Sequence, residues 1–169
     1  MAAQASALAD VKAARASIGE LKSERAEIKA GDRSELSAGA SATEKQLNSY
    51  FKGSGDSVLS KVDGMLGHAE SVLSDSGGKY NYVSAPSEKA ANGRASLAWT
   101  SFMSSKIRLT PEFFGNPGQQ ERSLIHEPTH IFGTNLWSDE TYGDSAVRQL
   151  NGRQALDNAD SYAQFVIHQ

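Results

Sequence analysis

The segment His126-Glu127-Pro128-Thr129-His130 constrains this chain more than any other part of its sequence. Side chains four residues apart on a helix lie on one face, so a helix here brings both imidazoles toward one point. Glu127 follows about 100° further round, where its carboxylate can face a water molecule on a shared metal ion. The spacing therefore predicts a metal-binding helix around which the fold is arranged.

The flanking residues bear on whether this helix forms. Leu124 and Ile125 place an apolar pair before the first histidine, and Gly133 is a typical C-terminal helix cap. Pro128 argues the other way, because an interior proline removes a backbone hydrogen bond and biases Glu127 away from helical angles. Three readings stay open: a working metal site, a zinc-binding module whose base is misdirected, or a helix with two unrelated histidines.

A catalytic zinc site uses three protein ligands and keeps a fourth position for water. In one class of zinc peptidases the third ligand is a histidine six positions after the second, but here that residue is Leu136. In thermolysin-like enzymes it is a glutamate on a later helix, and Glu140, the only glutamate after the motif, lies too close. Neither of these two third ligands is therefore present at its expected position in this sequence.

The segment that follows the helix resembles the corresponding part of the aspzincin (deuterolysin) family of zinc peptidases. Gly133-Thr134 leads to Asp139, and Tyr142-Gly143 follows three residues later. Other similar stretches are Ile107 to Thr110 with Pro111 to Phe114, Asn158 to Phe165, and more weakly Tyr50 to Gly53. The resemblance covers about residues 40 to 169 and is most specific from 123 to 165.

The resemblance implies a zinc-dependent endopeptidase in which His126, His130 and Asp139 bind the metal. A bound zinc ion lowers the pKa of water to about 7, and Glu127 would take the proton as that water attacks the peptide carbonyl. Glu140, one residue further on, is the competing carboxylate for the third position. The spacing from His130 and the Gly-Thr context favour Asp139.

Two further site residues follow from the resemblance. Tyr142 would hydrogen-bond the developing oxyanion, with simple packing as the alternative. Asp160 resembles an acidic residue that lines the substrate pocket in lysine-specific relatives, and its alternative role is a helix cap. Those relatives carry a glutamate three residues later, where this chain has Ala163, so strict lysine preference is not expected.

Composition narrows the function classes. The 169 residues suit one domain with a sizeable core, and a net charge of −3 gives no case for binding nucleic acid or an anionic membrane. No apolar run is long enough to span a bilayer. We expect a protein or peptide substrate as the partner and no binding of nucleic acid. An inhibitor or immunity protein is a second expected type of partner.

The sequence also suggests a location. It has no cysteine, whereas fungal members of the resembled family are secreted and disulfide-bonded. Its first residues lack the basic and apolar regions of a cleavable secretory signal. We therefore expect a bacterial relative that is extracellular or delivered by a specialised secretion route, as a secreted enzyme or a toxin.

The predicted fold class is α+β: a mostly helical zincin-like domain with a small antiparallel sheet beside the zinc helix. We predict two parts, an amphipathic helical extension over residues 1–35 and the peptidase domain over 36–169. The apolar stripe of the first helix is Val11, Ala14, Ile18, Leu21 and Ile28. This helix is either a docking or export segment outside the domain or a helix packed on it.

Other elements are predicted from caps and periodicity. Ser41 to Glu44 reads as a capping box that opens a helix ending at Gly53, and a second helix runs from Asp56 to Ser74. Strands are expected at 80–83, 96–99 and 107–110. An Asn92-Gly93 turn is expected before the second of these strands. The last strand is the candidate edge that pairs with substrate, or else part of a structural hairpin. A broken helical region follows from 144 to 168.

Overall fold

The computed structural model describes residues 2–75, 80–82, 97–100, 106–134 and 141–169. Within these residues the chain forms helices joined to one small sheet, which confirms the mostly helical α+β class. The helices are α1 (Ala2–Ala30), α2 (Ala38–Phe51), α3 (Asp56–Ser74), α4 (Pro111–Gly115), α5 (Pro117–Phe132), α6 (Asp144–Val147), α7 (Gly152–Asp157) and α8 (Ala159–Ile167). The strands are β1 (Tyr80–Tyr82), β2 (Ala98–Thr100) and β3 (Ile107–Leu109).

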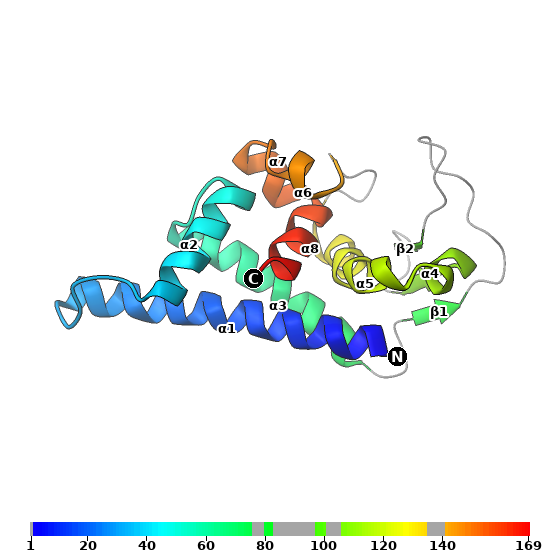
Figure 1. Ribbon diagram of the computed structural model, residues 1–169, viewed down its shortest axis with the longest axis horizontal. Coiled ribbons are helices and arrows are strands. Elements are labelled where there is room, and N and C mark those ends of the chain that lie inside the picture. Colours follow the sequence, from blue (N-terminus) through cyan, green and yellow to red (C-terminus); the bar gives the residue numbers. More distant parts are fainter. Residues whose placement is uncertain (1, 76–79, 83–96, 101–105, 135–140) are drawn as a thin grey trace.

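Helix α1 runs along the length of the other helices (Figure 1). Its apolar residues repeat at intervals of three and four, which places them on one face: Ala7, Val11, Ala14, Ile18 and Leu21, all fully buried. This face packs against α2, α3 and α5. The division of the chain at residue 35 stays a prediction, but in the structure α1 lies on the core of the second part.

The two helices that follow both pack against α1. The predicted capping box at Ser41 is wrong: α2 begins at Ala38, because the Ser37 side chain accepts a hydrogen bond from the amide of Ala40 and caps the helix earlier. The helix ends at Phe51, where Lys52 turns the backbone with a φ of 57°. The second predicted helix is confirmed, since α3 spans Asp56–Ser74.

The sheet is small and mixed. Strand β3 lies in the middle, with β1 parallel to it on one side and β2 antiparallel on the other. The predicted small sheet is present, but it is mixed rather than antiparallel, because β1 runs parallel to β3. Of the two roles expected for the strand at 107–110, the substrate-pairing edge is wrong, whereas antiparallel pairing with β2 agrees with the structural hairpin. Among the described residues both sides of β3 are paired, and it is β2 that packs against α5.

Helix α5 lies at the centre of the helical packing. It contacts α1, α3, α4 and α8, and its Leu124 and Ile125 are fully buried. Helix α8 packs against α5 and carries the buried rings of Tyr162 and Phe165 into the core. Phe51 of α2 contacts both rings, at centroid distances of 5.0 and 5.6 Å. The predicted metal-binding helix is thus held on several sides by apolar packing.

Candidate metal centre

Helix α5 carries both histidines of the motif. It begins with Pro117, whose missing amide costs nothing at the first helical position, and ends at Phe132, followed by the cap residue Gly133 with a φ of 128°. Pro128 lies inside this helix and does not end it. Glu127 therefore remains within the helix, on the turn that the two histidines share.

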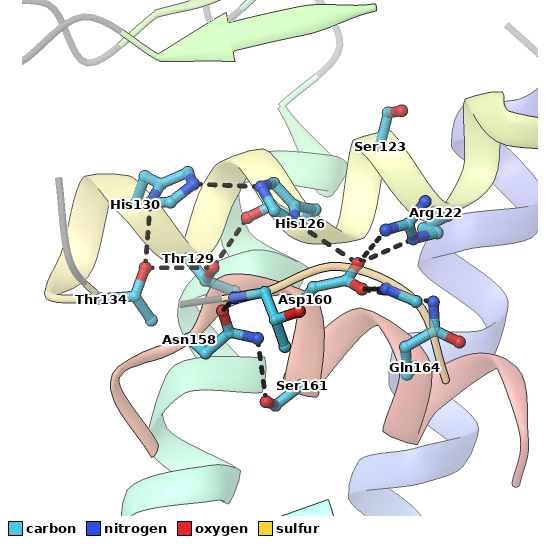
Figure 2. Close-up of polar contacts among 12 residues, drawn as sticks. Arg122, Ser123, His126, Thr129, His130, Thr134, Asn158, Asp160, Ser161 and Gln164 are labelled. Atoms are coloured by element: carbon cyan, nitrogen blue, oxygen red, sulfur yellow. Dashed lines mark hydrogen bonds and ion pairs between the residues drawn. The ribbon is translucent and has the colours of Figure 1, made fainter. Parts of the chain in front are cut away.

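The two imidazoles point toward each other from one face of α5 (Figure 2). Their Nε2 atoms lie 3.1 Å apart. The opposite ring nitrogens face protein groups: His130 Nδ1 lies 3.1 Å from Thr134 Oγ1, and His126 Nδ1 lies 3.7 Å from a carboxylate oxygen of Asp160. Histidines that bind metal through Nε2 typically have Nδ1 held in this way.

The spacing of the two nitrogens fits zinc. Zn–N bonds measure about 2.0–2.1 Å, so two nitrogens on one tetrahedral zinc ion lie about 3.3 Å apart. The 3.1 Å between the Nε2 atoms is close to that value. Asp139, the predicted third ligand, and its competitor Glu140 lie outside the described residues. The described part of the chain contains no group of three or more His, Cys, Asp or Glu side chains that could hold a metal.

Two buried threonines determine which nitrogen of His130 carries the proton. Thr129 Oγ1 donates to the carbonyl oxygen of His126 at 2.7 Å and lies 3.5 Å from Thr134 Oγ1. Because the single hydroxyl proton of Thr129 is used, Thr134 donates to Thr129 and accepts from His130 Nδ1. This network leaves the lone pair of His130 on Nε2, as metal binding requires.

A residue of the sheet, Thr100, is hydrogen-bonded to Glu127. Its side chain is 7% exposed, and the hydroxyl of Thr100 on β2 lies 2.9 Å from Glu127 Oε2 and 3.1 Å from its backbone oxygen. A hydroxyl has one proton, so Thr100 donates to one of these oxygens at a time. The sequence analysis missed Thr100, since nothing in the local pattern joins a threonine to a glutamate 27 positions later.

Asp160 is fully buried at the start of α8. Arg122 Nε and Nη2 lie 2.7 and 2.6 Å from its Oδ1, and the Gly143 amide donates to Oδ2 at 2.6 Å. Burial raises the pKa of Asp160, but His126, Arg122 and the Gly143 amide outweigh that effect and hold the pKa below its usual value. The role of Asp160 toward substrate stays a prediction; in the structure its side chain has no exposed surface and has partners on both oxygens.

Tyr142 lies beside the histidine pair. Its ring is 5.7 Å from the ring of His126 and nearly parallel to it, at 20°, while the Arg122 guanidinium lies 6.0 Å from its centroid. The side chain is 55% exposed, which a residue serving only to pack the core would not be. Arg122 is a second residue that the sequence analysis missed, although its place one turn before His126 on the same helix was a usable signal.

A helix that presents two converging histidines, with a glutamate on the same turn, in a mainly helical domain, defines the class of zinc metallopeptidases. The comparisons with known proteins give the particular family. The aspzincin family model, described as lysine-specific metallo-endopeptidase, matches residues 36–167. The chain belongs to this family, and zinc is the metal of its site.

Relatives in fungi are similar in sequence. A neutral protease 2 homologue of Pyricularia oryzae is 27% identical over 135 residues, 75% of this chain and 39% of that protein. A homologue of the same description from Phaeosphaeria nodorum is 30% identical over 131 residues, 71% of this chain and 36% of that protein. The chain thus spans less than two fifths of the curated relatives it matches. Their fungal source gives no support to the predicted bacterial origin.

A solved structure shares the fold. The zinc peptidase from Grifola frondosa superimposes with a TM-score of 0.56 at 19% identity, covering 96% of this chain and 93% of that one. This likeness extends over α1 as well as the part that the family model matches. In the described residues, no helix has the length and apolar character needed to cross a membrane.

Proposed function

We propose that the protein is a zinc-dependent endopeptidase that hydrolyses peptide bonds in protein substrates. The observation that carries this proposal is the convergence of His126 Nε2 and His130 Nε2, 3.1 Å apart, with Glu127 on the same turn. Family membership supports it. A helical adaptor would not require two converging imidazoles with a buried glutamate on the same turn.

The residues have distinct roles in this proposal. His126, His130 and Asp139 would hold the metal, and a zinc ion bound there would supply Lewis acidity to a water molecule and to the scissile carbonyl. Glu127 accepts the proton that the water loses and delivers it to the leaving amine. Tyr142, half exposed beside His126, donates its hydroxyl to the oxygen that gains charge.

The alternative is a zinc-binding module that no longer cleaves, and Pro128 is the residue that favours it. A proline at this position removes the amide that would bond to the Leu124 carbonyl, which costs about 3 kcal/mol in a helix interior. The uninterrupted course of α5 supports the active reading, because Glu127 keeps its helical place. An extracellular location, a role as a toxin and an inhibitor or immunity partner remain predictions.

The test measures zinc and cleavage separately on the full chain. Wild type is expected to hold one zinc ion per chain and to digest an unfolded protein substrate. Glu127→Ala should keep the zinc and lose at least about 100-fold in cleavage rate, the usual contribution of a general base. Asp139→Ala should lose the zinc, whereas its neighbour control Glu140→Ala should keep it.

Each part of the proposal has its own contrary result. Wild type that retains zinc without cleaving any protein would establish the binding-module alternative. Wild type that retains no zinc would refute the metal site. Loss of zinc in Glu140→Ala with retention in Asp139→Ala would show that Glu140, and not Asp139, is the third ligand.

A further inference from the structure

We infer that Asp160 and Arg122 form a positioning pair that orients His126 and fixes the Tyr142-Gly143 turn, and that Asp160 does not contact substrate. The inference rests on the proposed function and specifies how that site is assembled. It concerns residues on two separate elements, α5 and α8, that meet behind the histidine pair (Figure 2).

The first observation is that the Asp160 carboxylate has a full set of partners. Oδ1 takes two contacts from Arg122, at 2.7 and 2.6 Å, and faces His126 Nδ1 at 3.7 Å. Oδ2 takes the Gly143 amide at 2.6 Å and Gln164 Nε2 at 3.4 Å. With no exposed surface, this carboxylate could bind a substrate amine only by giving up several of these contacts.

The second observation is the effect on His126. A carboxylate only accepts hydrogen bonds, so its position opposite Nδ1 favours the tautomer with the proton on Nδ1 and the lone pair on Nε2. The threonine network does the same for His130 from the other side. Both lone pairs then point to the place between the rings, and a carboxylate behind a ligating histidine also increases its basicity.

The third observation links the pair to the segment that follows the predicted third ligand. Side chains at the start of α8 accept from two backbone amides of this segment: Asn158 Oδ1 from Thr141 at 3.2 Å, and Asp160 Oδ2 from Gly143 at 2.6 Å. Tyr142 lies between these two anchored amides, with its ring over His126. Asp160 thus ties α5, α8 and the 141–143 segment together at one point.

Arg122 offsets the unfavourable burial of the Asp160 carboxylate. Burying a lone carboxylate is strongly unfavourable, and the guanidinium supplies the opposite charge from one helical turn before His126. Its side chain is 25% exposed, and it also lies 3.1 Å from Gln119 on the same helix and 6.0 Å from the centroid of the Tyr142 ring. Arg122 therefore supplies the charge that balances the buried Asp160 carboxylate from the side of α5.

The experiment compares zinc affinity and substrate preference in Asp160→Asn, Arg122→Gln and the control Asp157→Asn. Asp157 lies on α7 in a surface ion pair with Lys61, outside the site. Affinity for Zn²⁺ alone is measured by competition with a chelator, and cleavage is measured on peptide pairs with lysine or norleucine after the scissile bond. Asp160→Asn should weaken Zn²⁺ binding about 10- to 100-fold, as loss of a group behind a zinc ligand typically does.

The same variant should reduce cleavage of both peptides by the same factor, and Asp157→Asn should change neither readout. Arg122→Gln should act in the same direction as Asp160→Asn, and it decides the question if Asp160→Asn does not fold. The inference is overturned if Asp160→Asn binds Zn²⁺ like wild type and loses only the lysine peptide, or if Arg122→Gln increases the preference for lysine. The Zn²⁺ readout does not depend on cleavage, so failure of the peptidase proposal would be seen separately.

Discussion

The contact between Thr100 and Glu127 gives the sharpest test of how the sheet serves the site. Thr100→Val keeps the shape of the side chain and removes the hydroxyl that lies 2.9 Å from Glu127 Oε2. A hydrogen bond to a charged group contributes about 1.5–3 kcal/mol, and Thr100 is half buried, so we take the lower end. If the loss of this hydrogen bond raises the activation free energy by about 1.5 kcal/mol, kcat falls about 10-fold.

The assay separates positioning from structure. KM and Zn²⁺ affinity should stay within about twofold of wild type, since neither the metal nor the bound substrate is touched, and Thr100→Ser should restore most of kcat. A double-mutant cycle of Thr100→Val with Glu127→Ala, read as the free energy of unfolding, should give a coupling of about 1 kcal/mol. Unchanged kcat in Thr100→Val, or a coupling near zero, would refute the reasoning.

Two further predictions concern stability away from the site. Burial raises the pKa of Asp63, but hydrogen bonds from Lys22 and Arg15 and their charges outweigh it and hold the pKa below its usual value. Because the unfolded state has the higher pKa, the stability from this group is complete above pH about 3.9 and is lost as pH falls through the folded value. Asp63→Asn should lower the free energy of unfolding at pH 7 and flatten its fall below pH 4 in urea titrations; parallel curves for both proteins would contradict this. Ile18→Ala should cost about 2–5 kcal/mol, since Ile18 is fully buried on α1, and a change below 1 kcal/mol would indicate that α1 is a separable extension.

Helix periodicity explains why part of the site could be predicted. The alignment of His126 and His130 follows from 3.6 residues per turn, a property of the backbone that needs no knowledge of the fold. Gly133 ended the helix as expected because glycine adopts positive φ at little cost. The apolar stripe of α1 and the span of α3 were readable for the same reason. Even the proline did not obscure the pattern, since apolar packing on several sides holds α5 together.

What the sequence by itself determined is therefore local: a helix with two histidines and a glutamate on one turn, and the family whose motif it carries. The tertiary structure alone decided that β3 is the central strand, that Thr100 reaches Glu127, and that Asp160 is buried against Arg122. These contacts join residues 27 and 38 positions apart, and no short-range spacing fixes such a distance. These contacts form only when β2 and α8 pack against α5. Packing buries the polar side chains, and a buried polar group needs a hydrogen-bond partner nearby.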